Sequence, residues 1–356
     1  MTAAEGKEKR DAGRRPALEI LKNYSGPDVR IMEVCGTHTH EIFRLGIRKI
    51  LPPSVKMISG PGCPVCVTPV NYIDEALMLA GEHGCTICTF GDLVRVPGTS
   101  SSLQKQRGAG AKVKVVYAPS DAVEYAAAHP GEQVVFLSVG FETTTPSVCL
   151  AVKDAMERGV ENFSVLTANK TMPGAYEAMK DSTDLFLYPG HVHAIIGTGI
   201  CEQLAERGVS GICAGFTAPE LVTALAVGVT RFERGEPFFV NCYPRVVKAE
   251  GQPAAVRLVA EMMEPCDSEW RGIGEIPLSG MKLREKYASY DARVRFSLPK
   301  VTGRVNPACR CGEVLQGKCL PSDCPVFGKG CTPEHPVGAC MVSGEGACSA
   351  FYLYGG

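Results

Sequence analysis

Short apolar runs alternate with amphipathic stretches from about residue 28 to residue 245. The runs are rich in β-branched residues and are too short for helices, which is typical of buried strands. Buried strands that alternate with helices indicate parallel sheets covered by helices on both faces. The expected strands are 29–34, 55–59, 85–90, 113–117, 134–139, 163–168, 185–188 and 211–214, and the expected helices include 71–80, 122–128, 147–157, 173–180, 195–207 and 219–227.

The number of expected strands fits two sheets better than one. We therefore predict an α/β protein with two Rossmann-like domains, whose parallel sheets face a central cleft, and a small cysteine-rich C-terminal domain. A break near residues 130–131 divides a first α/β domain, 28–130, from a second, 131–245. Residues 246–356 form the third domain, which begins helical and becomes irregular before the cysteines. The N-terminal helix, within 1–27, is expected to pack on this third domain.

Composition narrows the class of protein. The 356 residues carry a formal net charge of −1, so there is no basic field to attract nucleic acid or an anionic membrane surface. The N-terminus has charges but no apolar stretch long enough for a signal peptide, and no membrane span is expected. We therefore expect a cytoplasmic protein. In a reducing compartment 17 cysteines indicate metal binding or redox chemistry rather than structural disulfides.

The chemically unusual segments share one position relative to the expected strands, because each follows the end of one. In open α/β sheets the carboxyl ends of the strands line the ligand crevice, where loops and helix N-termini converge. A site in a cleft between the two α/β domains is the natural expectation. The segments are Cys-Gly-Thr-His at 35–38, Gly-Pro-Gly-Cys-Pro-Val-Cys at 60–66, Gly-Asp at 91–92, Gly-Phe-Glu-Thr-Thr at 140–144, Gly-His at 190–191 and Gly-Phe-Thr at 215–217.

Cys35 is the first candidate for a metal-binding or nucleophilic thiol. It stands directly before an expected helix, and a helix N-terminus lowers the pKa of a thiol and favours the thiolate. His38 and His40 add imidazole nitrogens nearby, and sulfur with nitrogen suits Fe, Zn or Cu. The alternative interpretation is that Cys35 is a small buried residue at the end of its strand.

Two Cys-x-x-Cys pairs follow in the sequence, and they differ in context. Cys63 and Cys66 lie in a loop with two glycines and two prolines, which suits a redox dithiol or half of a metal site. A tight turn with incidental cysteines is the alternative. Cys85 and Cys88 lie within an expected strand, where residues three apart point to opposite faces, so we predict that both are core residues.

Two further site candidates come from later strand ends. The segment that contains Glu142 is able to cradle an anion with its hydroxyls and the amides of the next helix, but a capped strand-to-helix turn explains it equally well. His191 is singled out only because it shares the expected crevice, since a lone histidine is usually structural.

The last part of the chain is rich in cysteine, glycine and proline and poor in large apolar residues. Such a segment cannot build a core, so a metal or covalent cross-link must order it. Four cysteines for a [4Fe–4S] cluster and two for a disulfide leave one spare. Two zinc ions would need eight ligands and would have to include His335. The cysteines are Cys309, Cys311, Cys319, Cys324, Cys331, Cys340 and Cys348.

Several of these motifs together resemble the HypD family of [NiFe]-hydrogenase maturation factors. The matching segments are Cys-Gly-Thr-His-Thr-His at 35–40, the glycine–proline loop at 60–66, Gly-Phe-Glu-Thr-Thr at 140–144, Gly-His-Val at 190–192 and Cys-Met-Val-Ser-Gly-Glu-Gly-Ala-Cys at 340–348. The resemblance spans residues from about 28 to 352.

The resemblance implies a scaffold rather than a conventional turnover enzyme. On it the Fe(CN)2CO group is assembled, with the partners HypC and HypE, before insertion into the large subunit of a [NiFe]-hydrogenase. It implies that Cys35 is the thiolate for this mononuclear iron, with His38 close by. Cys63 and Cys66 would form a dithiol in the same cleft.

The tail is similar to the active site of ferredoxin–thioredoxin reductase, where a [4Fe–4S] cluster lies beside a redox disulfide. This likeness implies that Cys311 and Cys340 form the dithiol, and Cys319 falls outside the family pattern. Electrons would then pass from the cluster through Cys311 and Cys340 to Cys63 and Cys66. Two rival functions are a cluster-dependent thiol–disulfide reductase and a zinc-stabilised interaction protein. The implied cluster ligands are Cys309, Cys324, Cys331 and Cys348.

Overall fold

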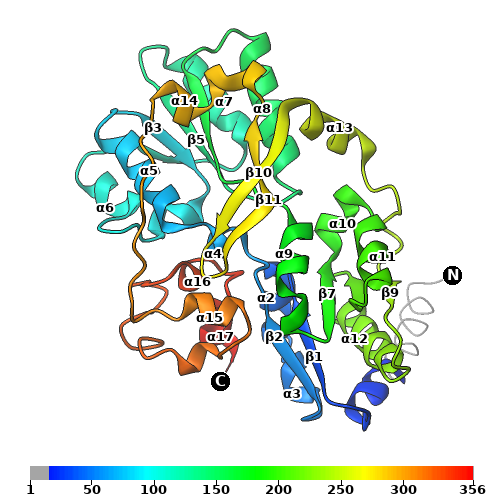
Figure 1. The fold of residues 1–356 in the computed structure, drawn as a ribbon. Helices are drawn as coiled ribbons and strands as arrows, with labels where there is room; N and C mark the ends of the chain where they lie inside the picture. The colour runs from blue at the N-terminus through cyan, green and yellow to red at the C-terminus, as the bar shows by residue number, and fades with distance from the viewer. Residues whose placement is uncertain (1–15, 356) are drawn as a thin grey trace, which may run out of the picture.

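The first sheet of the computed structural model, which describes residues 16–355, has five strands in the order β2-β1-β7-β8-β9. All of its neighbouring strands pair in parallel. It forms the lower right part of the molecule in Figure 1. Its strands are β1 (Val29–Glu33), β2 (Val55–Ser59), β7 (Leu185–Pro189), β8 (Gly211–Ala214) and β9 (Phe239–Asn241).

The second sheet has four parallel strands in the order β4-β3-β5-β6 and forms the upper left part of the molecule in Figure 1. Its central strands are buried along their whole length, as expected for a parallel sheet covered on both faces. Cys85 and Cys88 belong to core clusters on different sides of this sheet, which confirms that both are core residues. Its strands are β3 (Thr86–Thr89), β4 (Val113–Val115), β5 (Val134–Ser138) and β6 (Phe163–Thr167).

The two-sheet α/β architecture is confirmed, and the helices expected between the strands are present, except that the single helix expected at 195–207 is interrupted at Gly197, where φ is 78°. Helices of the α/β body are α2 (Gly36–Arg44), α3 (Ile47–Ile50), α4 (Pro64–Val67), α5 (Val70–Gly81), α6 (Leu103–Gly108), α7 (Pro119–Ala128), α8 (Thr145–Glu157), α9 (Met172–Met179), α10 (Gly190–Ile196), α11 (Gly199–Glu206) and α12 (Ala218–Phe232). Later helices are α13 (Pro253–Met262), α14 (Ala292–Arg295), α15 (Cys311–Leu315), α16 (Ala339–Val342) and α17 (Ala347–Tyr354). Short 3-10 helices are η1 (Gly91–Arg95), η2 (Lys180–Ser182), η3 (Glu285–Tyr290) and η4 (Pro321–Asp323).

The division of the body at residues 130–131 is not where the sheets separate. Strands β1 and β2 belong with β7, β8 and β9, whereas β3 to β6 form the other sheet. The chain therefore leaves the first sheet after β2 and returns to it at β7. The predicted domains 28–130 and 131–245 assumed that strands close in sequence share a sheet, which is a tendency and not a requirement.

An antiparallel hairpin, β10 (Met263–Trp270) and β11 (Gly274–Leu283), lies where an irregular connection was expected. It spans the molecule from the second sheet to the centre, as Figure 1 shows in yellow. Near its middle, the amide of Met281 donates to Asn169 O at 2.9 Å, beyond the end of β6. At its tip, the amide of Arg271 donates to Val67 O at 2.8 Å. The hairpin thus ties the second sheet to α4.

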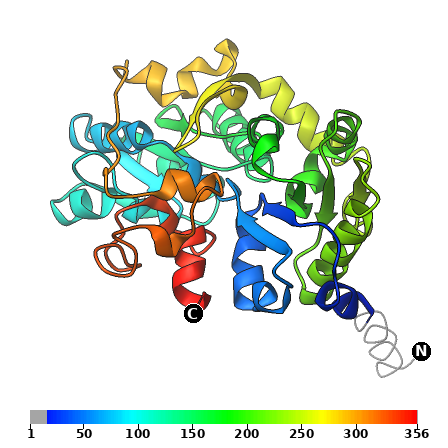
Figure 2. The same cartoon turned by 60° about the horizontal axis from the view of Figure 1, so that its bottom comes forward.

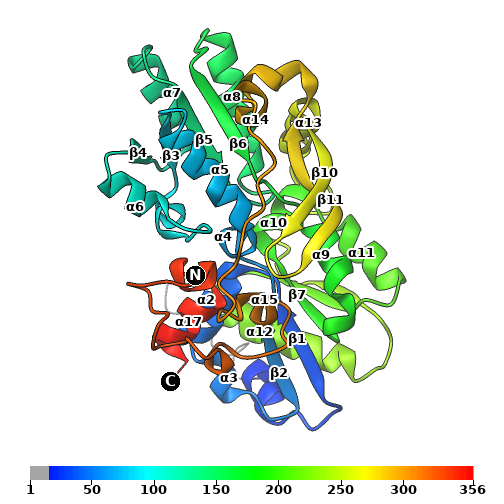
Figure 3. The same cartoon turned by 60° about the vertical axis from the view of Figure 1, so that its left-hand side comes forward.

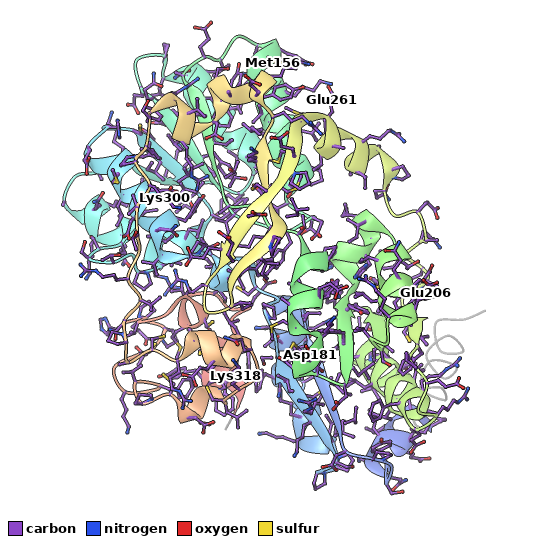
Figure 4. The ribbon with its side chains drawn as sticks, viewed as in Figure 1. Met156, Asp181, Glu206, Glu261, Lys300 and Lys318 are labelled. Carbon is purple, nitrogen blue, oxygen red and sulfur yellow. The ribbon has the colours of Figure 1, made fainter. Side chains whose placement is uncertain are left out.

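The cysteine-rich domain follows a long extended connection, which Lys300 marks in Figure 4. Helix α17 packs against α2, and α16 packs against both α4 and η1. Figures 2 and 3 show this domain, in orange and red, beside the segment that joins the two sheets. It therefore contacts the carboxyl ends of β1 and β2 through the helices that follow them.

The described part of the N-terminal helix, residues 16–22, packs elsewhere than expected. Leu21 is fully buried and joins Ala17 and Tyr24 in the core cluster of the first sheet, beside Val29 and Leu221. The predicted packing of this helix on the C-terminal domain is therefore wrong for these residues, and the rest of the predicted helix lies outside the described residues. Among residues 16–355, none of the helices combines the length and apolar character that crossing a membrane requires.

Candidate functional site

The site begins where β1 and β2 end side by side. These strands pair in parallel register, with Glu33 opposite Ser59, so the segments after them start at the same edge of the sheet. Cys35 follows β1 as the extended N-cap residue of α2. The amide of Gly36 then donates to Gly62 O at 2.8 Å, in the loop that follows β2. The two motifs singled out in the sequence are therefore adjacent.

The close approach of these loops requires glycine at position 62. A Cβ atom on Gly62 would lie 2.1 Å from the amide nitrogen of Cys35 and 2.4 Å from its Cα. Real Cβ atoms do not come this near to backbone, so a side chain there would push the loops apart. The short distance between Cys35 and the loop that holds Cys63 and Cys66 thus depends on the absence of a side chain at position 62.

Cys63 and Cys66 are held by the first turn of α4. Cys63 is the N-cap residue, Pro64 begins the helix, and the amide of Cys66 donates to Cys63 Sγ at 3.3 Å. Both thiols are buried, and burial raises the pKa of Cys66 well above its ordinary value. The pair is thus a preformed dithiol that bulk solvent does not reach.

A chain of thiols joins this dithiol to the C-terminal domain. The thiol of Cys340, in α16, is near enough to the thiols of Cys311, Cys348 and Cys66 for each of them to influence its pKa, and α16 packs against α4. Cys311 in turn lies near the thiol of Cys309, and its influence is the main reason that the pKa of Cys309 is raised. Cys340 is fully buried between the others. The sulfurs therefore form one continuous path between the two halves of the site.

The remaining cysteines of the domain lie around this path. Cys331 Sγ accepts a hydrogen bond from the amide of Val337 at 3.3 Å, and the electrostatic influence of Cys309 and Cys311 reaches it. Cys324 donates to Ala308 O at 3.7 Å, directly before Cys309. Lys318 in Figure 4 marks the side of the domain that faces the first sheet. Four thiolates of these kinds are the donor set that a [4Fe–4S] cluster takes, so the residues present fit the group that the sequence implies.

Burial shifts the pKa of the Cys35 thiol in the direction opposite to the one expected at a helix N-terminus. The pKa of this thiol is raised to about 12, mainly by desolvation and partly by the charge of Glu345. The amides of His38 and Thr37 at the start of α2 act in the opposite direction, as predicted for a helix N-terminus, but they are weaker. The expected lowering of the pKa is therefore wrong, because the sequence did not show how deeply the thiol is buried.

The imidazoles near Cys35 are gathered on one aromatic ring. His38 and His191 lie on Phe216, with ring centroids 4.6 Å and 3.8 Å away. His38 Nε2 lies 3.0 Å from Gly215 O, which can only accept, so this nitrogen carries the proton. Burial lowers the pKa of His38 to about 4, and its Nδ1 has no partner among the described residues. Its lone pair is thus available to a ligand.

Glu345 is a site residue that the sequence analysis missed. The hydroxyl of Thr37 donates to its Oε1 at 2.7 Å, and the carboxylate influences both Cys35 and His191 electrostatically. It lies in the quoted segment 340–348, but only the cysteines there were given roles. No local signal marks it, because its partners are some 300 residues away along the chain (308 for Thr37).

Glu142 contacts the start of α9. Its Oε1 accepts a hydrogen bond from the amide of Met172 at the start of α9, at 2.8 Å. Its Oε2 is buried without a partner among the described residues. Burial raises its pKa to about 7. The charge of Glu142 acts on Tyr176, whose hydroxyl lies 3.2 Å from His193 Nε2, so the carboxyl borders a buried polar group.

No group of three or more His, Cys, Asp or Glu side chains within residues 16–355 is arranged to hold a single metal ion. A [4Fe–4S] cluster does not need such a group, because each of its irons takes one cysteine. A mononuclear iron at Cys35 would therefore take most of its ligands from outside the chain.

The fold and the site define a class of protein, a two-sheet α/β protein in which a cysteine-rich domain meets a buried dithiol. Comparison with known proteins is more specific. The family model described as HypD, "Hydrogenase formation hypA family", matches residues 15–355, and the chain belongs to this family. It is 43% identical over 338 residues to "Hydrogenase maturation factor HypD" of Rhodobacter capsulatus, covering 92% of this chain and 90% of that protein.

Two other relatives agree. The chain is 44% identical over 337 residues to the HypD of Rhizobium leguminosarum bv. viciae, covering 91% of this chain and 88% of the relative. It is 41% identical over 336 residues to the HypD of Escherichia coli, covering 92% and 89%. Both relatives carry the name "Hydrogenase maturation factor HypD". The family resemblance read from the motifs is thereby confirmed.

Replacing Gly62 with alanine tests the contact between the two loops. We expect Gly62→Ala to lower the unfolding free energy by about 1–3 kcal/mol, as overpacking of a close contact does. It should also make Cys35 and Cys63 react faster with iodoacetamide at pH 8, because separated loops admit reagent. Gly131→Ala is the matched control, since a Cβ there meets nothing within 4 Å. Equal stability and equal reactivity of the two variants would contradict the required contact.

Replacing Glu142 with glutamine tests the buried carboxyl. Its pKa is raised from 4.5 to about 7 on folding, so the unfolded chain ionises first. The stability from the neutral carboxyl is full below 4.5 and is lost as the pH rises through 7. The unfolding free energy of Glu142→Gln minus that of the wild type should therefore rise by about 3 kcal/mol across this window. Urea unfolding at several pH values measures it, and the exposed Glu236→Gln is the control. A difference independent of pH would contradict the burial of the charge.

Proposed function

We propose that this protein is a maturation scaffold on which the Fe(CN)2CO group of a [NiFe]-hydrogenase is assembled, together with HypC and HypE. Membership of the HypD family supports a role in hydrogenase maturation, and the buried cysteines of the site support thiol and iron chemistry. The observation that carries the proposal is the contact of Cys66 with Cys340, which joins the dithiol beside Cys35 to the cysteine-rich domain. The role is proposed for the cytoplasm, where thiols stay reduced.

The iron that carries cyanide and carbon monoxide is the cargo in this proposal. Cys35 would bind it as a thiolate, and metal coordination would supply the driving force that its raised pKa otherwise opposes. His38 Nδ1 offers a neutral nitrogen in the same region. Because this chain lacks a complete ligand set for a single ion among its described residues, ligands from HypC and the diatomic groups would complete the coordination.

The order of sulfur contacts specifies a thiol–disulfide exchange. After Cys63 and Cys66 have given up two electrons as a disulfide, the Cys340 thiolate attacks Cys66 and the Cys63 thiolate leaves. The Cys311 thiolate then attacks Cys340, and the Cys66 thiolate leaves. The net result moves the disulfide from the first pair to the second and two electrons in the opposite direction. The nearness of Cys66 to Cys340 and of Cys340 to Cys311 supports this order of attack.

A [4Fe–4S] cluster bound by Cys309, Cys324, Cys331 and Cys348 would supply electrons next to the second pair. Cys309 and Cys348 are each near enough to Cys311 for it to influence their pKa values, and Cys340 likewise influences the pKa of Cys348. Cys319 is half-buried beside Arg310, and the only sulfur that influences its pKa is that of Cys324, so it is not assigned a role. Three of the proposed ligands, Cys309, Cys331 and Cys348, thus lie near the proposed dithiol without including it.

A thiol–disulfide reductase for protein substrates is a weaker candidate. Such an enzyme must present a sulfur to its partner, as redox-active cysteines are partly exposed. Cys63 is 3% exposed and Cys66 is fully buried. Their electrons are therefore directed to a bound group inside the protein.

Replacing Cys340 with serine tests the relay. Cys340→Ser should keep the iron–sulfur absorption of anaerobically purified protein, because Cys340 is not a proposed ligand. It should abolish hydrogenase maturation, because the sulfur between Cys66 and Cys311 is gone. Infrared spectra of the complex purified with HypC should show CN and CO stretches for the wild type and at least tenfold weaker ones for the variant.

Cys319→Ser is the matched control in the same domain, and it should keep both the absorption and the infrared bands. Normal maturation by Cys340→Ser would refute the relay. A colourless protein that contains zinc instead of iron would refute the cluster and favour a zinc-stabilised interaction protein.

A further inference from the structure

A large cavity lies between the second sheet and the cysteine-rich domain. Its volume is about 1400 Å³, and the described residues that line it come from four separate parts of the chain. Residues 97–105 form one wall, 303–307 and 309–313 form another, and 334–338 close it, with the hairpin tip between them. Such a volume accommodates a small organic molecule with room for water. A cluster held by cysteines would take only the sulfur-lined corner.

Arg271 is the distinctive residue of this cavity. It lies at the hairpin tip, is 6% exposed and lines the cavity wall. Its Nε donates to Thr68 O at 2.7 Å, but its Nη2 is buried with no partner among the described residues. A buried guanidinium nitrogen without an acceptor is costly, and an anion is its natural partner.

The rest of the lining agrees with an anionic occupant. Basic side chains outnumber carboxylates there, and one carboxylate, Glu313, already pairs with Arg310. Arg95 donates to the carbonyls of Pro333 and Val342, and its charge also helps to lower the pKa of Glu334. The basic lining residues are Arg95, Lys105, Arg271, Arg304 and Arg310, and the acidic ones are Glu269, Glu313 and Glu334.

The cavity reaches only one end of the thiol path. Cys309 and Cys311 are among its lining residues, whereas Cys340 is fully buried behind Cys311. A Cβ on Gly338, which also lines the cavity, would lie 2.6 Å from the sulfurs of both Cys309 and Cys311. Because position 338 has no side chain, the approach to these sulfurs stays open. Because Cys309 is a proposed cluster ligand, Cys311 is the sulfur of the proposed relay that a reagent in the cavity would meet.

We propose that this cavity binds a small carboxylate-bearing thiol, which reduces the Cys311–Cys340 disulfide formed in the relay. Arg271 binds its carboxylate, and Cys311 receives its sulfur. The inference rests on the proposed function, because the relay is what produces this disulfide. It supplies a second source of electrons beside the cluster.

The exchange balances in atoms and electrons. The thiolate of the bound molecule attacks Cys311 Sγ, a mixed disulfide forms, and the Cys340 thiolate leaves and takes a proton. A second thiol molecule attacks the sulfur of the first in the mixed disulfide, so that Cys311 leaves as a thiolate and takes a proton. Two molecules of thiol become one disulfide, and the protein gains two electrons and two protons.

Trapping the mixed disulfide tests the site in the full-length protein. In the background Cys319→Ser with Cys340→Ser, Cys311 lacks its resolving partner, so oxidised glutathione should modify it with saturation kinetics. Adding Arg271→Gln should raise the half-saturating concentration about tenfold, the effect of losing one charge-assisted hydrogen bond. The neutral 2-hydroxyethyl disulfide should react equally with both proteins. Peptide mass spectrometry locates the modified cysteine.

Arg304→Gln, at an exposed lining position, repeats the test at lower risk to folding and should give a smaller change of the same sign. Equal effects on the charged and neutral reagents, or no effect of either arginine variant, would overturn the inference, as would modification elsewhere than Cys311. Iron content measured on the same samples separates the two proposals. If the protein contained no iron but glutathione modification still depended on the arginines, the result would refute the proposed cluster and leave the proposed thiol site standing.

Discussion

The contact between α4 and α16 is the interaction on which the site depends. The C-terminal domain has too few large apolar residues to fold around a core of its own, so it must pack against the body. It does so with sulfur, because Cys311, Cys331, Cys340 and Cys348 share one core cluster with Cys63 and other residues of the first sheet and its helices. The packing that stabilises the domain is therefore the same packing that aligns the thiols.

Most elements of the body could be predicted from the sequence, but their arrangement could not. A buried strand is recognisable because its apolar run is continuous, and β5 is an example. The sheet to which a strand belongs depends instead on where the connection before it places the strand. The residues of β1 and β3 do not indicate that the two strands belong to different sheets. The β10–β11 hairpin was missed because its exposed face is polar and its strands contain Pro265 and Pro277, which argue against a strand.

The cysteines of the site were predictable because their types and spacing carry chemistry. Their electrostatics were not, since the pKa of Cys35 depends on desolvation by residues distant in sequence. Glu345 and Arg271 were missed for a similar reason. Each acts through partners from other elements, Thr37 for the first and Thr68 for the second, and neither has a neighbour that indicates a role.

Burial explains why a relay of thiols suits this fold better than direct reduction from solvent. The raised pKa values of Cys35 and Cys66 keep both thiols protonated and unreactive at neutral pH. In the proposed function, reactivity would appear only when a metal binds Cys35 or when a neighbouring sulfur exchanges with Cys66. A deeply buried path also keeps external oxidants from the dithiol, at the cost of needing Cys311 at a cavity wall. The burial that raises the pKa values of Cys35 and Cys66 therefore also leaves Cys311, at the cavity wall, as the place where a reagent would reach the thiol path.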